Sequence, residues 1–215
     1  MNVGVDEAGK GPVLGSMFAA AVRGDPAAVP DAVDDSKALD HQRRLELAPA
    51  IRERADATAV VEVPVAAIDG DRDMNTLTVE AHADALTGVV SAGDSVLHDA
   101  ADTNAVRFER RIADRLDTDC EVRARHGADA EAPLVAAASI LAKVRREAHV
   151  DRLHEEYGDC GSGYPSDPTT RAFLESFVEA NEELPDCARA SWQTSQDALA
   201  AIEQVDLGQF SSVGE

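Results

Sequence analysis

Lysine is scarce in this chain of 215 residues, which has three lysines against seventeen arginines. The 41 acidic residues give a formal net charge of −21. Binding to nucleic acid ordinarily calls for a basic patch, so this balance by itself argues against such a partner. An acidic, lysine-poor surface is instead expected of a protein that works in concentrated salt, where charge repulsion is screened. We therefore expect the remaining lysines to be functional: Lys10, Lys37 and Lys143.

Long hydrophobic runs and cysteines are also few. No segment approaches 18 uncharged apolar residues, and the opening residues lack a basic and apolar leader. We therefore expect a soluble, cytoplasmic protein without a membrane partner. Cys120, Cys160 and Cys187 are odd in number and widely spaced, which fits neither a zinc pattern nor a disulfide framework. Reduced, structurally incidental thiols are expected.

The common nucleotide-binding motifs are missing. Gly9, Gly11 and Gly15 miss the G-x-G-x-x-G spacing by one residue. Lys10 stands outside any G-x-x-x-x-G-K-[ST] pattern. The sequence therefore disfavours a nucleotide-binding fold.

The most informative stretch that is present lies at the start of the chain. Val3 to Val5 predict a buried strand that leads into Asp6 and Glu7 and then into a glycine-rich turn. Neighbouring side chains on a strand point to opposite faces, so the two acids are expected to share an ion only if the strand ends there. A solvated surface pair is the alternative in so acidic a chain. Their position favours half of a metal site beside an anion-binding turn.

The remaining pattern predicts an α/β fold, a mixed sheet flanked by helices. Strands are expected at 3–5, 13–22, 57–65, 95–99 and 120–125, and helices at 39–54, 75–90, 104–116, 133–157, 169–180 and 190–203. Their order is summarised as β-β-β-α-β-α-β-α, in which the early hairpin marks the sheet as mixed. We expect a main domain at 1–157, a small C-terminal helical part at 158–203 that completes a substrate cleft, and a tail at 204–215.

Spacing also predicts the helix caps and the buried helix faces. Asn75 or Thr76 is expected to cap the helix near residue 75, and Asp167 the helix that begins at Pro168. The apolar positions expected to face inward are Leu45, Ala48, Ile51, Val106, Ile112, Leu116, Leu134, Ala138, Leu141 and Val144. Ser139, Lys143 and Arg146 lie along another face of the helix at 133–157, as a stripe with two basic residues.

Four carboxylates stand at strand ends or beside helix starts: Asp6, Glu7, Asp99 and Asp129. If the first and fourth strands are neighbours, Asp6 and Asp99 meet. Clustered carboxylates repel one another unless a cation lies among them, and oxygen ligands favour Mg²⁺ or Mn²⁺. Two such ions can catalyse phosphodiester hydrolysis. With lysines for phosphate and a tyrosine for a sugar or base, the set predicts a nuclease.

The sequence resembles type 2 ribonuclease H, the ribonuclease HII family. The segments that carry this resemblance keep the family's order: 4–12 (GVDEAGKGP), 35–39 (DSKAL), 99–102 (DAAD), 126–129 (HGAD), 136–143 (AAASILAK) and 161–168 (GSGYPSDP). The resemblance implies an RNase H-like sheet of five strands with a small C-terminal helical part. It also implies cleavage 5′ of ribonucleotides in RNA/DNA hybrids and in duplex DNA, which leaves 3′-hydroxyl and 5′-phosphate ends.

The same resemblance implies roles for individual residues. Asp6, Glu7, Asp99 and Asp129 match the family's metal-binding acids, with two Mg²⁺ or Mn²⁺ ions during catalysis. Gly9, Lys10 and Gly11 match the turn that contacts the junction of RNA and DNA, including the 2′-hydroxyl that distinguishes RNA. Tyr164 matches a tyrosine that packs on the following deoxyribose. The positions expected near phosphates are Ser36, Lys37, Ser139 and Lys143.

Three features depart from the family's pattern or compete with it. Lys10 stands where the family usually has arginine, so a bidentate side-chain contact would be lost although a backbone contact would remain. His98 replaces an apolar residue before the third acid. Asp102 is close enough in sequence to compete with Asp99, which ranks first on the motif match.

The tail resembles a sliding-clamp peptide through Gln204, Leu207 and Phe210. Only the first of the usual paired aromatics is present, so a disordered tail is the alternative. Rival functions are another RNase H-like nuclease or strand transferase, a non-catalytic nucleic-acid or clamp-binding module, and a phosphatase or Mg²⁺-binding protein. Retention of all four acids argues against the binding module, and we expect a monomeric enzyme.

Overall fold

A mixed sheet of five strands forms the centre of the larger part of the chain. The computed structural model describes residues 1–30, 32, 33 and 39–201. Its strands are β1 (Asn2–Ala8), β2 (Met17–Gly24), β3 (Ala57–Val63), β4 (Ser95–Asp99) and β5 (Glu121–Arg125). They lie in the order β3-β2-β1-β4-β5. The pairs β1–β2 and β2–β3 are antiparallel, whereas β1–β4 and β4–β5 are parallel. The predicted mixed sheet is confirmed, as is the pairing of the first and fourth strands.

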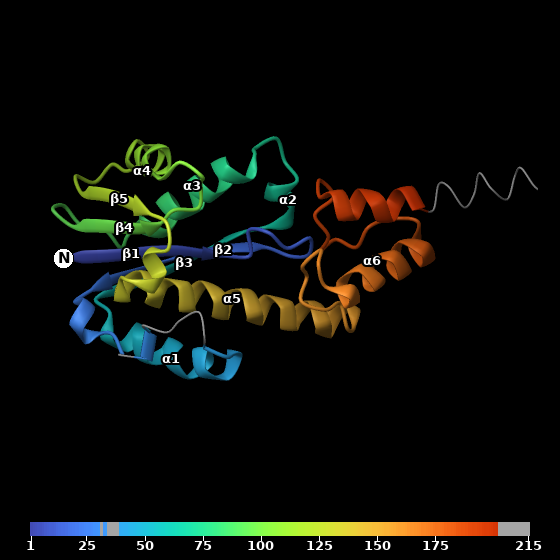
Figure 1. Ribbon diagram of the computed structural model, residues 1–215, viewed down its shortest axis with the longest axis horizontal. Coiled ribbons are helices and arrows are strands. Elements are labelled where there is room, and N and C mark those ends of the chain that lie inside the picture. The colour runs from blue at the N-terminus through green and yellow to red at the C-terminus, as the bar shows by residue number, and fades with distance from the viewer. Residues whose placement is uncertain (31, 34–38, 202–215) are drawn as a thin grey trace, which may run out of the picture. The chain divides into compact units, whose positions relative to one another are not determined.

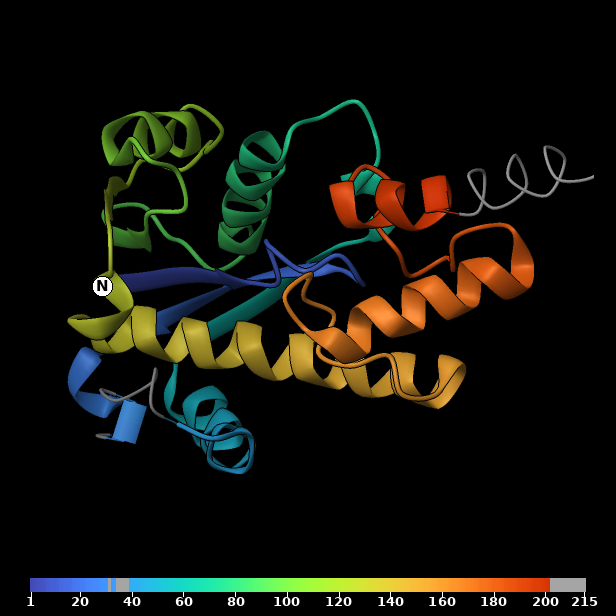
Figure 2. The same ribbon diagram turned by 45° about the vertical axis from the view of Figure 1, so that its right-hand side comes forward.

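Helices cover both faces of this sheet (Figure 1). One face carries α3 (Met74–Leu86) and α4 (Ala105–Ala113), and the other carries α1 (His41–Arg54) and the first part of α5 (Pro133–Tyr157). Figure 2 shows α1 and α5 on the same side of the strands. The predicted order of elements, β-β-β-α-β-α-β-α, lacks α1, which lies between β2 and β3.

Aspartate and asparagine side chains cap the N-termini of most of these helices. Asp40, Asn104 and Asp167 each accept a hydrogen bond from a backbone N–H of the first turn. The cap of α3 is Asp73, whose Oδ1 accepts from the Thr76 N–H at 2.9 Å. The prediction of Asn75 or Thr76 was therefore wrong by two or three residues, because an aspartate just before them satisfies the same donor.

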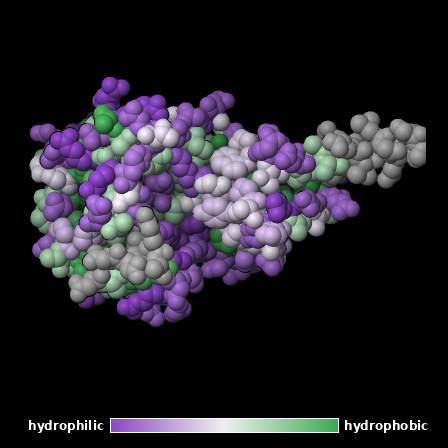
Figure 3. All heavy atoms as spheres, in the orientation of Figure 1, coloured by the Kyte–Doolittle hydropathy of each residue, from purple (hydrophilic) through white to green (hydrophobic). Residues whose placement is uncertain are grey.

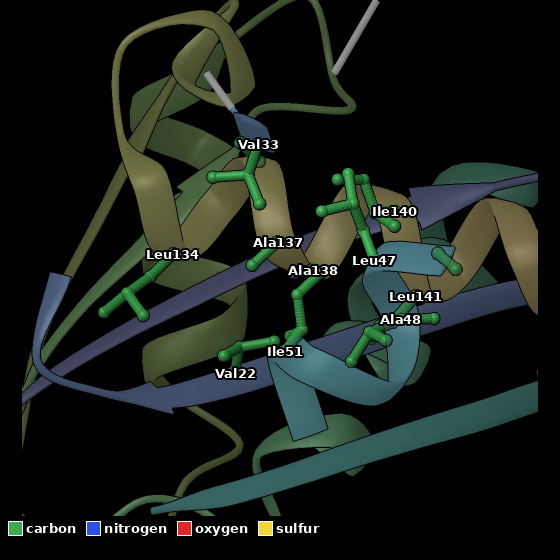
Figure 4. Packing of buried hydrophobic residues seen from close by; sticks show 13 residues of the cluster. Val22, Val33, Leu47, Ala48, Ile51, Leu134, Ala137, Ala138, Ile140 and Leu141 are labelled. Carbon is green, nitrogen blue, oxygen red and sulfur yellow. The ribbon is translucent and has the colours of Figure 1, made fainter. Parts of the chain in front are cut away.

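The core between α1, α5 and the sheet is built from small and branched aliphatic side chains. Figure 4 shows Leu47 and Ile51 of α1 against Leu141 of α5 and Val22 of β2. Two predicted core positions are wrong: Leu45 is 39% exposed and Val106 is 74% exposed. Their neighbours Leu47 and Phe108 are buried instead.

The described chain divides into two compact units. The first holds residues 1–10, 17–63 and 72–148, and the second holds 11–16, 64–71 and the residues from 149 onward. The second unit contains α2 (Val65–Ile68), α6 (Pro168–Asn181) and a helical stretch at 193–201. Among the described helices, none has the length and apolar character needed to cross a membrane.

Residues 13–16 belong to this second unit rather than to the predicted strand at 13–22. The Val13 N–H donates to the Gly163 carbonyl at 2.8 Å, and Leu14 forms an isolated bridge with Ala188. The chain therefore enters β2 only at Met17. Val13 and Leu14 pack in the second unit's own core with Leu174 and Val178.

Candidate active site

Asp6 and Glu7 lie inside β1, not beyond its end. Asp6 pairs with Ala20 of β2 and Glu7 with Ala19, and the strand continues to Ala8. The prediction that the strand stops to let both acids converge was wrong. Alternation along the strand instead sends the two side chains to opposite faces of the sheet.

Three carboxylates converge on the α5 side of β1. Asp6, Asp99 and Asp129 each offer an oxygen, and these oxygens all lie within 4.8 Å of one another. Asp99 ends β4, and the parallel register that pairs Val5 with His98 brings it beside Asp6. Asp129 lies in a 3-10 helix, Ala128–Ala130, which follows Gly127 in a left-handed conformation with φ of 69°. We call Asp6, Asp99 and Asp129 the acid cluster.

Burial and mutual repulsion mark the acid cluster electrostatically. Burial raises the pKa of Asp6 well above its usual value, and the negative charges of Glu7 and Asp99 raise it further. The nearby Ser139 hydroxyl opposes this rise. The pKa of Asp99 is also raised, first by burial and then by Asp129 and Glu7, although the Ala128 N–H donates to it at 2.9 Å.

A divalent cation fits this donor set. The three carboxylate oxygens are hard ligands of the kind that Mg²⁺ and Mn²⁺ prefer. A cation among them would replace the repulsion that raises these pKa values by attraction. The acid cluster therefore fits the divalent metal that the sequence predicted.

Glu7 occupies the other face of β1 and contacts a histidine of α3. Its Oε2 lies 2.9 Å from Nε2 of His82, which is fully buried. Glu7 is not among the three residues whose oxygens converge, yet its charge raises the pKa of both Asp6 and Asp99. The sequence alone does not single out His82, because a histidine at one position of a predicted helix carries no signal of a distant partner.

Asp102, the competing carboxylate, is paired elsewhere. The guanidinium of Arg107 donates to both of its oxygens, with Nη2 at 2.6 Å from Oδ1 and 2.8 Å from Oδ2. These bonds lower the pKa of Asp102 to about 2. The geometry therefore favours Asp99 over Asp102 as the third acid.

The predicted substrate-binding turn begins directly after β1. Gly9 has φ of 88°, a left-handed conformation that glycine adopts without strain. The Lys10 ammonium donates to the Ala101 carbonyl at 2.6 Å and to Asn75 Oδ1 at 3.1 Å, so it holds the turn to neighbouring segments of the first unit.

Gly11 and Tyr164 belong to the second unit and lie side by side. A Cβ built on Gly11 would lie 3.8 Å from Cε1 of the tyrosine ring. Tyr164 is 45% exposed. The Gly11 carbonyl accepts a hydrogen bond from the Trp192 indole N–H at 3.3 Å.

Of the other predicted substrate-binding residues, the structure describes only the two on α5. On α5, Ser139 is buried beside Asp6, and Lys143 follows one turn later and is half-buried. Ser36 and Lys37 lie outside the described residues, as do Gln204, Leu207 and Phe210 of the predicted clamp peptide.

Comparison with known proteins gives one consistent answer. The sequence profile described as Ribonuclease HII matches residues 3–195. A ribonuclease HII of Haloarcula marismortui is 60% identical over 211 residues, which cover 98% of this chain and all of that protein. The crystal structure of ribonuclease H2 from Pyrococcus horikoshii is 33% identical with a TM-score of 0.88, and covers 94% of this chain and 98% of its own. RNase HII in the structure of its complex with PCNA from Archaeoglobus fulgidus is 36% identical with a TM-score of 0.83, at 92% and 96% coverage.

Proposed function

Because the chain belongs to the ribonuclease HII family of metal-dependent endonucleases that act on RNA/DNA hybrids, we propose that it cleaves the phosphodiester bond 5′ of a ribonucleotide. The substrates proposed are RNA/DNA hybrids and duplex DNA that contains ribonucleotides, and the products carry 3′-hydroxyl and 5′-phosphate ends. The observation that supports this most is the convergence of Asp6, Asp99 and Asp129.

In this proposal the acid cluster and Glu7 hold two Mg²⁺ or Mn²⁺ ions. When bound, such ions supply a nucleophilic water and stabilise charge on the leaving oxygen. Asp6 contributes from the middle of β1 and Asp99 from the end of β4, so the sheet fixes their separation. Glu7 contributes from the opposite face of β1 through the oxygen that His82 leaves open.

Selection of a ribonucleotide is assigned to the turn after β1 and to Tyr164. The backbone of Gly9, Lys10 and Gly11 is proposed to contact the 2′-hydroxyl, which only RNA carries. Tyr164, beside Gly11, offers an exposed ring face on which a deoxyribose can pack. Ser36, Lys37, Ser139 and Lys143 are proposed to lie near the phosphates.

The test is cleavage of a labelled DNA duplex with one ribonucleotide, in molar KCl with Mg²⁺ or Mn²⁺. We expect incision 5′ of the ribonucleotide by the wild type and a loss of at least about 100-fold in D6N, because one ligand oxygen of the acid cluster is removed. D84N is the matched control, since Asp84 is an exposed acid on α3, and it should cleave normally. Binding without cleavage by the wild type in every salt and metal would support the binding-module alternative instead.

A second proposal concerns a partner. We propose that Gln204, Leu207 and Phe210 bind a sliding clamp. The resemblance of this peptide to clamp-binding sequences supports the proposal, as does the Archaeoglobus fulgidus complex. The clamp of the source organism should retain the wild type and release F210A; equal recovery of both would contradict the proposal.

A further inference from the structure

Three polar side chains, Glu7, His82 and His98, lie in contact one after another and lead from β1 into the interior of the first unit. Glu7 Oε2 lies 2.9 Å from His82 Nε2, and His82 Nδ1 lies 3.0 Å from His98 Nδ1. Both imidazoles have no exposed surface. His98 immediately precedes Asp99 in β4, and His82 lies on α3, so the contacts join two elements to β1.

The contacts determine where the protons lie. A carboxylate only accepts hydrogen bonds, so His82 donates from Nε2 and its Nδ1 must accept if the ring is neutral. His98 then donates from Nδ1, and its Nε2 is left as a bare acceptor. Nε2 of His98 is indeed a buried atom without a hydrogen-bond partner. The reverse arrangement would bury an unpaired N–H at this atom, which is the rarer and costlier outcome.

The surroundings keep the pair dry and fix its rings. Phe108 of α4 is buried and sets its ring edge-on to both imidazoles, at centroid distances of 5.1 Å from His82 and 6.2 Å from His98. The two imidazole planes are inclined by only 24°. The donor side of the hydrogen bond to Glu7 is therefore closed to solvent, since the His82 side chain is fully buried.

We propose that His82, fixed in turn by His98, is a positioning residue that holds one oxygen of Glu7 and leaves Oε1 for the metal. Within the described residues, Oε2 is the Glu7 oxygen that takes part in a hydrogen bond. A free glutamate at the edge of a site samples several rotamers, and ordering it costs free energy. The hydrogen bond from His82, which His98 holds in place, orders the Glu7 side chain during folding, so Glu7 is oriented before the ion binds. The inference rests on the proposed role of Glu7 as a metal ligand.

The first test measures Mn²⁺ binding to the full chain by titration calorimetry, without substrate. In H82L/H98L both imidazoles become apolar, so no unpaired polar atom is left in the core. We expect its Mn²⁺ dissociation constant to rise about 10- to 100-fold. H41Q is the control, since His41 is exposed and pairs with Glu147 away from the acid cluster, and it should bind Mn²⁺ as the wild type does.

A matched pair of amides separates positioning from packing. The Nε2 amide of glutamine stands as many bonds from the backbone as the imidazole Nε2, so H82Q can still donate to Glu7. Asparagine in H82N places its N–H too near the backbone to reach. We expect H82Q to recover most of the Mn²⁺ affinity and H82N to resemble the double variant. The half-saturating Mn²⁺ concentration for cleavage should follow the same order, whereas KM for the duplex should not change.

The proton assignment is tested separately by ¹⁵N NMR of the imidazoles. We expect His82 with its proton on Nε2 and His98 with its proton on Nδ1. A His82 ring without a proton on Nε2 would overturn the inference, and so would wild-type Mn²⁺ affinity in both H82N and the double variant. E7Q distinguishes the two proposals: if it binds Mn²⁺ normally, the role of Glu7 itself fails, whereas weak binding by E7Q with normal binding by H82N contradicts only the role of His82.

Discussion

At the scale of the residue, Asp6 shows how the acid cluster lowers the stability of the folded protein. Its carboxylate is buried, and the pKa is raised by burial and by Glu7 and Asp99. A folded-state pKa above the unfolded one means that the folded protein binds the proton more tightly. The metal-free protein therefore loses stability as the pH rises from the ordinary pKa of aspartate through the raised value of Asp6.

Asp6→Asn should remove this penalty. We expect metal-free D6N to be more stable than the wild type at pH 7 by about 1 kcal/mol, because a buried charge beside other acids is removed. The difference should vanish near pH 3, where Asp6 is protonated in both the folded and the unfolded state. Urea unfolding across pH measures it, and added Mn²⁺ should reverse the ranking at pH 7 by stabilising only the wild type. Equal pH profiles for the two proteins would contradict the expectation.

The sequence identified the members of the acid cluster and predicted that Asp6 and Asp99 meet, but it did not predict the face to which Glu7 turns. Asp6, Asp99 and Asp129 were found because each stands near a strand end or a helix start within a recognisable motif. The side to which Glu7 turns depends on how far β1 continues, and the pairing with Ala19 and Ala20 decides this. No local pattern reports that pairing. The contact between His82 and Glu7 could not be predicted for the same reason, since the two residues meet only once α3 has packed on the sheet.

At the scale of the element, β1 and α5 approach each other unusually closely at Gly4. A Cβ built on this residue would lie 2.2 Å from the carbonyl carbon of Leu134 and 2.4 Å from its oxygen. Only a residue without a side chain allows this contact between backbones. The approach brings α5, and with it Ser139, beside Asp6.

Gly4→Ala should therefore destabilise the protein by about 3 kcal/mol or more, because backbone atoms of both elements must move apart. Gly24→Ala is the matched control on the neighbouring strand, since its Cβ would meet only ordinary contacts at 3.6 Å. Thermal unfolding of both variants makes the comparison. A G4A protein as stable as G24A would show that the two elements separate at little cost.

Helix prediction failed at this scale for a definite reason. Helical spacing placed both Leu45 and Val106 inward, yet both are exposed. Spacing describes the period of a pattern, whereas the face that is buried depends on where the neighbouring elements lie. In α4 the face toward the sheet is set by Phe108 and Ile112.

At the scale of the whole molecule, the excess of acidic residues is the dominant feature. Hydrophilic residues cover most of the face drawn in Figure 3, and the formal net charge is −21. At low ionic strength this charge repels itself across the folded chain. The similarity to a protein of Haloarcula marismortui, a haloarchaeon, is consistent with the interpretation of the acidic surface as an adaptation to salt.

Stability should therefore rise with KCl. Most of the gain is expected below about 1 M, because the screening length falls from about 10 Å at 0.1 M to about 3 Å at 1 M. Melting temperatures across a KCl series measure the effect, and a sucrose series serves as the control that stabilises without screening. Full stability in low salt would contradict the interpretation of the acidic surface.

Because Asp6 and Glu7 point to opposite faces of β1, the face that each acid occupies depends on whether an odd or an even number of residues is inserted before them. One extra residue between Val5 and Asp6 would exchange the faces of the two acids, whereas two extra residues would restore them. The longer glutamate would then enter the acid cluster, and the shorter aspartate would face His82. In the proposed site, divalent metal binding would therefore depend on the register of β1, because only an insertion of an even number of residues before Asp6 keeps each acid on its present face.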